Sequence, residues 1–420
     1  MKKKQVIIIG AGASGMTAAI FAARQGAEVT ILEHKDRVGK KILSTGNGKC
    51  NLSNRKMDAS CYRSSVSGFP MKVIRQFPVE KTLDFFEELG VVVKDRNGYL
   101  YPWSGQASAI LDVLRGGLKE NDVRVVTECE IHRILLPSGK DRRDGGRYFR
   151  VETGKGVFQG DSLILAAGSK AAPGTGSDGS GYELAAALGH RIVKPLPALV
   201  QLKCRESFYK QISGVRTDGR VTLWSDGELL ASDSGELQLT DYGISGIPVF
   251  QVSRYAVRAL DGGRTVSAVI DFCPELGRKQ TIAHLYDRRE RGGDRMIEDF
   301  FTGWIHKKLA QLFLKLSGIR GDRKVKTLTD EEIRTLSAFV KEFRTEIVGS
   351  NSFEQAQICC GGVDVRDLDP FTLESKKRKG LYLIGELLDV DGICGGYNLQ
   401  WAWSTGAIAG MHAGKWNDSN

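Results

Sequence analysis

The stretch VIIIGAGASGMTAAIFAARQGAEVTILE, residues 6–33, decides the fold of the first part of the chain. It opens on a short β-branched run, 6–9, which is typical of a strand buried in a parallel sheet. The Ala-rich segment 16–25 favours a helix, and the apolar run 29–32 predicts a second strand that ends at Glu33. Strand, glycine-rich turn, helix and strand in this order predict a unit that binds a dinucleotide.

The three glycines of this motif each have a physical task. Gly10 allows the tight turn after the strand, Gly12 lets a pyrophosphate approach the backbone, and Gly15 lets helix and strand pack closely. The start of the helix offers N–H groups and the positive end of its dipole to the phosphates. Glu33 is placed to accept hydrogen bonds from the ribose hydroxyls. The motif alone does not distinguish NAD from FAD.

The N-terminus has a second interpretation, because three lysines at 2–4 precede an apolar run as in an export signal or a membrane anchor. The glycines break that run, and no other segment has the roughly 20 uninterrupted apolar residues of a membrane helix. The eight cysteines are scattered, with no CxxC and no Cys/His cluster of metal-ligating spacing. We therefore expect a cytoplasmic protein with reduced thiols and no metal or membrane partner.

Length and charge leave the partner partly open. The 420 residues are enough for two or three domains, and the formal net charge is +10. Basic runs lie far apart, at 142–143, 288–291 and 376–379. Solvated loops and attraction of an anionic cofactor explain the charge more simply than a nucleic-acid surface, which stays an alternative.

The loop that follows Glu33 is a candidate cofactor loop. Residues 37–54 are rich in Gly, Ser and Asn, which argues against a regular element. Lysines at 40, 41 and 49 and the amides of 46–48 could wrap a phosphate or the edge of a polar ring. The loop leaves the strand that ends at the predicted ribose site, so we expect it to lie along the cofactor.

The rest of the chain shows three kinds of pattern. In the first part we expect helices at 79–89, 104–118 with Ser104 as N-cap, and 182–188, and short strands at 91–93 and 99–101. An antiparallel meander is expected from 123–129, 131–136, 148–151 and 157–158, with a polar turn at 137–146, followed by a buried strand that ends on small residues at 162–168. Residues 195–272 alternate strands and turns, 279–316 and 330–339 are helical, and 343–348 is a returning strand.

The last segment repeats the pattern of the first. Residues 381–384 predict a buried strand, 385–396 a glycine-rich loop and 399–412 a helix, although no GxGxxG is present. If this unit joins the first domain, the middle of the chain is an insertion and the cofactor domain is discontinuous.

These motifs resemble a bacterial flavoprotein family known as NAD(FAD)-utilizing dehydrogenases or aminoacetone-oxidase-like proteins, with which proposed bile-acid ene-reductases are grouped. The resemblance covers nearly the whole chain. It is carried by Gly10–Gly15 with Glu33, the loop 39–54, YPWS at 101–104, GISG at 243–246, GGV at 361–363, and GELLDVDGICGGYNLQWAW at 385–403.

The resemblance implies FAD and an α/β fold class: a discontinuous Rossmann-like FAD-binding domain with an inserted β-barrel-like domain and a small helical domain. The implied boundaries are 1–194 and 358–420 for the FAD domain, 195–275 for the β-rich substrate domain with its return strand at 342–357, and 276–341 for the helical insertion. The implied cofactor-binding residues are Gly10, Gly12, Ala13, Ser14, Gly15, Glu33, His34, Lys40, Lys41, Thr45, Gly46, Asn47, Gly48, Cys50, Asn51, Ala167, Gly168, Gly385, Glu386, Asp391, Gly396, Tyr397, Asn398 and Leu399.

The sequence departs from the family pattern at two places. Lys40 and Lys49 stand where the family often has Arg, and a lysine lacks the planar fork that makes bidentate contacts. Cys359 and Cys360 replace the Thr and small residue that usually precede the Gly-Gly-Val motif. If that strand lines the flavin, a thiol lies near the ring.

The expected activity is hydride transfer between flavin N5 and a small organic substrate. One candidate is an oxidase or dehydrogenase of a small amine or alcohol. The second is an ene-reductase that acts on an apolar, steroid-like substrate and takes electrons from NAD(P)H bound transiently at the flavin, because no second Rossmann fingerprint is present. The third is a flavin-dependent RNA-modifying enzyme. The sequence leaves the oligomeric state open.

No catalytic acid or base can be assigned from the sequence. None of the six histidines lies in a nucleophile–base motif, and His190 follows a helix-ending glycine, which favours a structural role. Tyr101 and Tyr397 could line the substrate cavity. The N-terminus of the helix near Asn398 is expected to stabilise negative charge on the reduced flavin.

Overall fold

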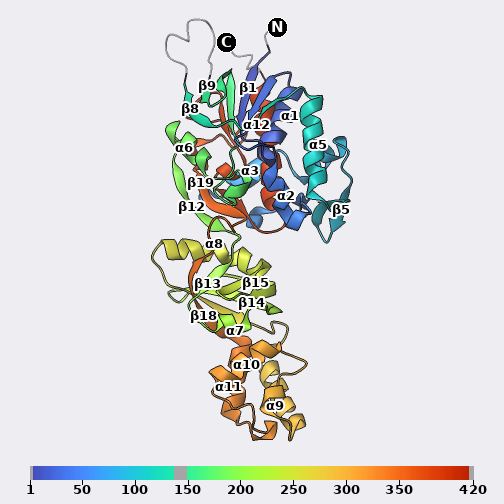
Figure 1. Ribbon diagram of the computed structural model, residues 1–420, viewed down its shortest axis with the longest axis vertical. Helices are drawn as coiled ribbons and strands as arrows, with labels where there is room; N and C mark the ends of the chain where they lie inside the picture. Colours follow the sequence, from blue (N-terminus) through green and yellow to red (C-terminus); the bar gives the residue numbers. More distant parts are fainter. Residues whose placement is uncertain (1–2, 137–148, 416–420) are drawn as a thin grey trace. The chain divides into compact units, whose positions relative to one another are not determined.

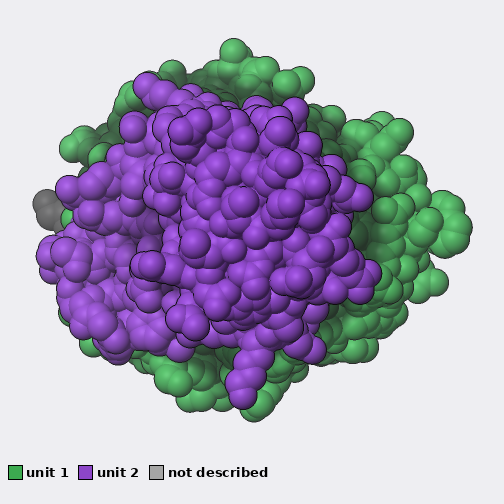
Figure 2. Space-filling model, turned by 90° about the horizontal axis from the view of Figure 1, so that it is seen from below, with its two compact units in different colours: residues 1–196, 357–420 green, residues 197–356 purple. Residues whose placement is uncertain are grey.

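The computed structural model describes residues 3–136 and 149–415. It divides into two compact units, unit 1 of residues 1–196 and 357–420 and unit 2 of residues 197–356 (Figure 1, Figure 2). The polar turn expected at 137–146 and Tyr148 lie outside the described residues. The finer division of the chain into five segments remains a prediction.

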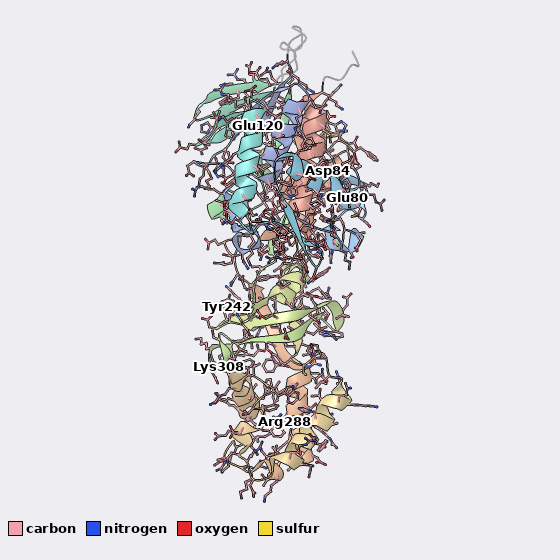
Figure 3. All side chains as sticks on the ribbon, turned by 90° about the vertical axis from the view of Figure 1, so that its right-hand side faces the viewer. Glu80, Asp84, Glu120, Tyr242, Arg288 and Lys308 are labelled. Atoms are coloured by element: carbon pink, nitrogen blue, oxygen red, sulfur yellow. The ribbon has the colours of Figure 1, made fainter. Side chains whose placement is uncertain are left out.

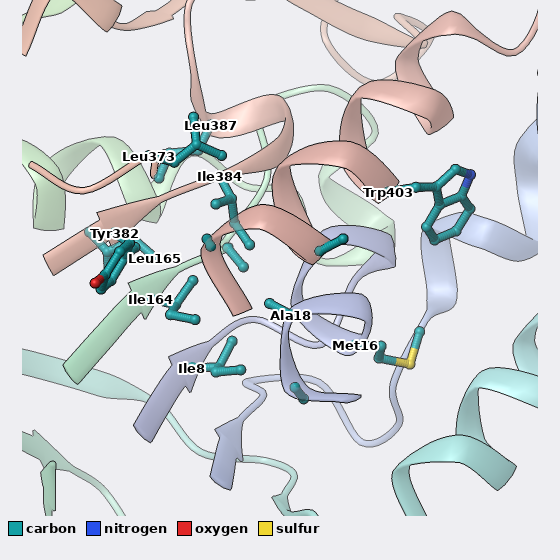
Figure 4. Close-up of a cluster of buried hydrophobic side chains, with 14 of the residues drawn as sticks. Ile8, Met16, Ala18, Ile164, Leu165, Leu373, Tyr382, Ile384, Leu387 and Trp403 are labelled. Atoms are coloured by element: carbon teal, nitrogen blue, oxygen red, sulfur yellow. The ribbon is translucent and has the colours of Figure 1, made fainter. Parts of the chain in front are cut away.

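Unit 1 is built on a five-stranded parallel sheet. Its order is β20 (Leu381–Leu383), β11 (Ser162–Leu165), β1 (Gln5–Ile9), β2 (Glu28–Leu32), β7 (Arg124–Val126). All four neighbouring pairs are parallel, and β20, from the last part of the chain, pairs with β11 from the first. Ile8, Ile164 and Tyr382 lie on three neighbouring strands of this core (Figure 4). The predicted α/β class with a discontinuous Rossmann-like domain is confirmed.

Two helices from opposite ends of the chain pack closely together. They are α1 (Ala13–Arg24) and α12 (Tyr397–Gly414). A Cβ added at Gly406, Gly410 or Gly414 would lie under 3.0 Å from the carbonyl oxygen of Ser14, Ala18 or Ala22, respectively. Glycine every fourth residue therefore gives α12 a smooth stripe against which the backbone of α1 rests. This contact joins the first and last segments of the sequence.

The remaining elements of unit 1 surround this core. The helices are α2 (Lys40–Ser44), α3 (Phe69–Ile74), α4 (Val79–Glu88), α5 (Ala107–Glu120) and α6 (Ser180–Ala187). The short strands are β3 (Ser53–Asn54), β4 (Tyr62–Ser64), β5 (Val93–Arg96), β6 (Tyr99–Pro102), β12 (Ile192–Ala198), β19 (Ile358–Val363) and β21 (Val390–Gly392). Glu80 and Asp84 on α4 and Glu120 on α5 lie on the outer surface (Figure 3), whereas Phe85 and Phe86 of α4 are buried.

Two expectations for unit 1 were wrong. The run 123–129 does not belong to the antiparallel meander, because β7 pairs in parallel with β2. Only β8 (Ile131–Leu135), β9 (Phe149–Thr153) and β10 (Gly156–Gly160) form that sheet. A three-residue strand carries too little alternation to reveal its partner. Ser104 is not the N-cap of α5, whose N-cap is Gln106; the Ser104 hydroxyl instead accepts a hydrogen bond from the Gln106 N–H (3.4 Å).

Unit 2 contains a closed six-stranded barrel and a set of helices. The strand order is β13 (Leu202–Cys204), β16 (Gly243–Gly246), β15 (Glu228–Leu239), β14 (Arg216–Ser225), β17 (Val266–Asp271), β18 (Phe343–Ser350). The helices outside the barrel wall are α7 (Tyr209–Ile212), α8 (Ile247–Asp261), α9 (Arg278–Gly292), α10 (Lys307–Leu316) and α11 (Asp330–Lys341). Thr329 and Glu332 form a capping box at the start of α11.

Helix α8 corrects the expectation that residues 195–272 contain only strands and turns. Pro248 stands in its first turn, and Val249, Val252, Ser253, Ala256 and Val257 are buried at helical spacing. Its β-branched valines concealed this periodicity. The helical stretch expected at 279–316 is likewise interrupted, because α9 ends at Gly292 and α10 begins at Lys307. Among the described residues, no helix is long and apolar enough to cross a membrane.

Candidate cofactor site

The glycine turn after β1 has the geometry expected of a phosphate cradle. Gly10 has φ +100°, and a Cβ there would lie 2.5 Å from the Ala166 carbonyl oxygen. A Cβ at Gly15 would collide with the Gly10 carbonyl. Gly12 differs, because its φ of −80° suits any residue and no atom lies within 4 Å of an added Cβ. Close packing against neighbouring backbone explains why residues 10 and 15 are glycines. At position 12 the structure leaves room for a side chain, so a glycine is needed there only if a ligand lies above the turn.

Glu33 is held at the end of β2 by the backbone. Its side chain is buried, and its two oxygens accept hydrogen bonds from the Ala11 N–H (2.8 Å) and the Lys35 N–H (2.9 Å). Each carboxylate oxygen has further lone pairs that can accept from ribose hydroxyls. The neighbouring His34 Nδ1 lies 3.4 Å from Glu33 Oε1. Its buried Nε2 lies 3.7 Å from Asp178 Oδ2 and has no hydrogen-bond partner among the described residues.

The cofactor loop distinguishes its two neighbouring lysines. Lys41 Nζ lies 2.6 Å from Glu386 Oε2, and the Ser169 hydroxyl donates to the same oxygen at 3.1 Å. Lys40 instead pairs with Asp36, whose side chain is 58% exposed. Lys41 thus links the loop to the last segment of the chain, and Lys40 makes a surface ion pair.

Left-handed backbone shapes the turn that follows α2. Gly46, Asn47 and Cys50 have φ near +55° (55°, 54° and 56°), and the Cys50 N–H donates to the Thr45 carbonyl (3.0 Å). Burial raises the pKa of the Cys50 thiol to about 12, so it stays protonated. Sequence reasoning found this turn, including Gly48, from its composition. The expectation that 37–54 has no regular element was wrong, because α2 (Lys40–Ser44) and β3 (Ser53–Asn54) lie within this range.

Asn51 is the clearest sign of a ligand site. Its side chain is buried, and its Oδ1 has no hydrogen-bond partner in the described structure. The same oxygen would lie 2.9 Å from a Cβ added at Gly396. A buried acceptor without a donor is costly, so it marks a place where a bound group donates a hydrogen bond. The imide N–H of a flavin ring is such a donor.

The start of α12 lies against this turn. Gly396, its N-cap, has φ +93°, and a Cβ there would lie 2.6 Å from the Ser53 carbonyl oxygen. The first turn carries no acidic residue that would neutralise the positive end of the helix dipole. The Asn398 side chain bonds the Gly392 backbone at both atoms (2.8 and 3.0 Å), so only its backbone is available to a ligand. Leu399 follows in the same turn and is half-buried.

Two further predicted residues are buried beside this turn. Tyr397 is buried, and its carbonyl accepts from the Tyr62 hydroxyl (2.9 Å). Burial raises the pKa of Tyr397, which keeps the phenol neutral. Asp391 is buried in β21, which pairs with β4.

Gly385 brings the last glycine motif onto the first. Its φ is +70°, and a Cβ there would lie 2.5 Å from the Ser14 hydroxyl oxygen. Its N–H donates to Thr405 Oγ1 (3.1 Å), and its carbonyl accepts from the Trp401 indole (3.0 Å). The turn 385–387 is thereby fixed to α12 and lies against Ser14 at the start of α1.

The turn after β11 lies against two other segments. A Cβ at Gly168 would lie 2.5 Å from the Ser177 hydroxyl oxygen, and one at Gly181 would lie 2.7 Å from Ala167 Cβ. Ala167 and Gly168 therefore line a tightly packed turn, as their small size predicts.

Sequence reasoning missed the polar residues that hold this site together. The Ser53 hydroxyl donates to Gln400 Oε1 (2.6 Å), and Gln400 Nε2 donates to Thr82 Oγ1 (2.8 Å) and Ser404 Oγ (3.0 Å). The polar residues Gln400 and Ser404, one helical turn apart in a mostly apolar helix, were the signal for this network. It fixes the start of α12 onto the loop that follows Asn51.

Two further buried residues lie near Glu386. The sequence had already pointed to Cys359 as a thiol near the flavin if its strand lines the ring, whereas Tyr182 was missed. Cys359 is buried in β19, and burial raises the pKa of its thiol, opposed by hydrogen bonding to the Lys170 backbone and the Ser169 side chain. Tyr182 on α6 is buried, and its hydroxyl has no hydrogen-bond partner among the described residues. Burial raises the pKa of Tyr182, with further contributions from Cys359 and Glu386.

Two other expectations concern residues away from the site. His190 is buried and its Nε2 lies 2.9 Å from Ser375 Oγ, which supports a structural role. All eight cysteines are free. Within residues 3–136 and 149–415, no group of His, Cys, Asp and Glu could hold a metal ion.

Comparison with known proteins adds the following findings. The family described as HI0933-like protein Rossmann domain matches residues 4–412. The chain is 44% identical over 413 residues to a 3-dehydro-bile acid delta(4,6)-reductase of Clostridium scindens, covering 97% of this chain and 98% of that protein. It is 28% identical over 402 residues to a ribosomal RNA dihydrouridine synthase of Haemophilus influenzae, covering 95% and 96%. It is 27% identical over 409 residues to a ribosomal RNA dihydrouridine synthase of Escherichia coli, covering 96% of each chain.

Among solved structures, a 3-ketosteroid-delta4-(5alpha)-dehydrogenase from Rhodococcus jostii RHA1 is 13% identical, with a TM-score of 0.48, covering 98% of this chain and 97% of that one. At this distance the likeness carries no inference about function.

Proposed function

The chain belongs to the HI0933-like Rossmann family, and on that premise we propose that it reduces a carbon–carbon double bond conjugated to the ketone of a steroid. It is an FAD-dependent oxidoreductase, and the resemblance predicted from its motifs is confirmed. The observation that carries the substrate is the 44% identity, over nearly the full length of both chains, to a bile acid reductase. Among the activities expected from the sequence, this favours the ene-reductase over an oxidase or dehydrogenase of small amines or alcohols.

When bound, FAD would supply the hydride chemistry that links the proposed donor NAD(P)H to the double bond, and water would supply the accompanying proton. Each double bond then gains one hydride and one proton, while NAD(P)H leaves as NAD(P)⁺. A cytoplasmic location is part of the proposal, because reduced nicotinamides are available there and the eight free cysteines stay reduced.

The first glycine motif would hold the pyrophosphate. The open space above Gly12 admits the phosphates, and the start of α1 directs N–H groups at them. Glu33, fixed by two backbone N–H groups, would accept from the adenosine ribose. These residues would orient the FAD along the cofactor loop.

The last glycine motif would hold the flavin end. Asn51 Oδ1 is a buried acceptor without a donor, and it lies beside Gly396 at the start of α12. The first turn of α12 would stabilise the negative charge that reduction adds to the flavin. Lys41 and Glu386 would keep the cofactor loop and the turn 385–387 together.

A half-reaction tests this proposal without any nicotinamide. The holoenzyme is photoreduced anaerobically and mixed with a 3-oxo steroid that carries delta(4,6) double bonds. The proposal predicts that the steroid reoxidises the flavin and gains two hydrogens for each double bond reduced, while the saturated 3-oxo steroid does nothing. A flavin that stays reduced with the unsaturated steroid contradicts the proposed substrate.

RNA modification is the second candidate function. Two relatives, at 28% and 27% identity, are ribosomal RNA dihydrouridine synthases. Formation of dihydrouridine also adds hydrogen across a double bond conjugated to a carbonyl, so the same flavin chemistry serves both substrates. Reoxidation of the photoreduced enzyme by uridine-containing ribosomal RNA, together with salt-sensitive RNA binding, would favour this candidate.

A further inference from the structure

Strands β5 and β6 present rings and cations on one face. The strands are antiparallel, with Lys94 opposite Tyr101 and Arg96 opposite Tyr99. Successive side chains of a strand point to opposite faces, so residues 94, 96, 99 and 101 share one face and Leu100 lies on the other. Leu100 is fully buried, which places the shared face toward solvent.

Trp103 extends this row beyond the end of β6. Its N–H donates to the Val92 carbonyl (2.8 Å), which continues the pairing of the two strands. Trp103 is 65% exposed, Val92 68% and Tyr99 43%. We call Tyr99, Tyr101 and Trp103 with Lys94 and Arg96 the aromatic row. From Tyr99 to Trp103 it extends about 13 Å.

The charge on this face is positive. Lys94 Nζ lies 5.0 Å from the centre of the Trp103 ring, and Arg96 Cζ lies 5.8 Å from the centre of the Tyr101 ring. Asp95, the acid of β5, alternates to the opposite face, where it bonds Arg55 Nε (3.3 Å) and the Gly98 N–H (2.8 Å). Rings interleaved with cations, with Tyr99 and Trp103 exposed, suit a ligand that has an aromatic base and phosphates.

One end of the row adjoins the cofactor site. A Cβ at Gly395 would lie 2.8 Å from the Tyr99 ring, and one at Gly46 would lie 3.8 Å from the Tyr101 ring. Gly395 precedes the N-cap of α12, and Gly46 belongs to the cofactor loop. The row therefore leads from the predicted flavin end toward Trp103. In Figure 1, β5 lies at the outer edge of unit 1.

We propose that the aromatic row binds the nucleotide part of the electron donor NAD(P)H, with the adenine on Trp103 and the phosphates at Lys94 and Arg96. The inference rests on the proposed function only in taking NAD(P)H as the donor. It supplies a docking surface for a nicotinamide cofactor in a chain whose sequence has one Rossmann fingerprint. The nicotinamide end would then point along the row toward Tyr99 and the flavin.

The surroundings of the row favour a dinucleotide over an RNA strand. The row has the length of an extended dinucleotide and two cations for its phosphates. Beyond Val92 the chain runs back to α4, whose exposed side carries Glu80, Asp84 and Glu87 (Figure 3 labels the first two). These acidic residues on the preceding helix do not favour binding of a longer polyanion.

Calorimetric titration of the oxidised holoenzyme with NADP⁺ and NAD⁺ tests the site directly. Trp103→Ala is expected to weaken binding about tenfold, since one base stacked on an aromatic ring contributes about that much. Trp103→Phe keeps a ring and should stay within a few-fold of the wild type. Lys94→Gln with Arg96→Gln should weaken binding and flatten its salt dependence.

Matched controls separate the site from general surface effects. Phe371→Ala removes another exposed ring of unit 1 (59% exposed), and Lys119→Gln removes an exposed cation on α5; both should bind NADP⁺ as the wild type does. In stopped-flow experiments, Trp103→Ala should show a higher apparent Kd for NADPH than the wild type. Its rate of flavin reduction at saturating NADPH should be unchanged.

Several outcomes overturn the inference. The first is that Trp103→Ala binds NADP⁺ and NAD⁺ with the affinity of the wild type. The second is that the wild type binds neither NADP⁺ nor NAD⁺. The third is that Trp103→Ala loses single-stranded RNA binding but keeps its affinity for the nucleotides. Failure of the steroid half-reaction would refute the proposed substrate but leave this binding result standing, so the two failures are distinguishable.

Discussion

Lys41 and Glu386 stand 345 positions apart in the sequence, yet Lys41 Nζ lies 2.6 Å from Glu386 Oε2. Each side chain is 22% exposed, so the pair is only partly screened by water. It joins the loop after the first glycine motif to the turn of the last one. The two ends of the chain thus meet at the proposed cofactor site.

Glu386→Gln should therefore weaken the contact between the cofactor loop and the turn 385–387. Loss of a charged hydrogen bond to a half-buried lysine costs about 2 kcal/mol, so we expect a lower free energy of unfolding and faster loss of FAD on dialysis. Lys40→Gln is the matched control, because its partner Asp36 is exposed and the pair contributes under about 1 kcal/mol. Equal effects of the two substitutions, measured by denaturant titration and flavin absorbance, would contradict this role of the pair.

The packing of α12 on α1 predicts a strong effect of one methyl group. In Gly410→Ala the new Cβ meets the carbonyl of Ala18, so the helices must separate, at a cost of about 1–3 kcal/mol or more. Gly116→Ala in α5 adds its Cβ in open space and should be neutral or stabilising by up to about 1 kcal/mol. Thermal unfolding monitored by circular dichroism distinguishes the two. A Gly410→Ala variant as stable as Gly116→Ala would refute the close helix contact.

Gly12 and Gly15 should respond differently to substitution. Gly12→Asp changes a position with ordinary backbone angles and no neighbour within 4 Å, so the fold should persist while the new carboxylate repels the pyrophosphate. We expect FAD binding at least about tenfold weaker with an unchanged circular dichroism spectrum. Gly15→Ala should fail to fold because its Cβ overlaps the Gly10 carbonyl. Full flavin retention in a folded Gly12→Asp would show that the phosphates bind elsewhere.

Because His190 is buried, we predict that the free energy of unfolding depends on pH. Burial lowers the pKa of His190 below its ordinary value of about 6.5, because the imidazolium would lose its solvation. The unfolded chain then binds this proton more tightly than the folded one. Neutral His190 therefore contributes to the free energy of unfolding fully above about pH 6.5, and this contribution is lost as the pH falls below that value.

His190→Gln should flatten this fall in the free energy of unfolding between about pH 7 and pH 5. Substitution of the exposed His132 by Gln should leave the slope as in the wild type. Parallel slopes for the wild type and His190→Gln in urea titrations would assign the pH dependence to other groups.

How far the sequence predicted the structure depends on the range of each interaction. The unit from β1 to Glu33 follows from local pattern, because strand period, turn glycines and helix propensity all act within 29 residues. The last strand–glycine–helix unit was equally readable, and α12 begins two residues before the expected start. The partner of Lys41 and the neighbours of Gly410 were not predictable, since they depend on which distant segments pack together. Helix α8 was missed although its buried residues follow helical spacing, because valines at those positions favour strands when read locally.

The central claim is that residues from both ends of the chain hold one FAD. Titration of the flavin-free protein with FAD, followed by quenching of flavin fluorescence, tests it most directly. The account predicts saturation at one FAD per chain and a yellow, folded holoprotein. A folded protein that stays colourless and takes up no FAD would contradict it.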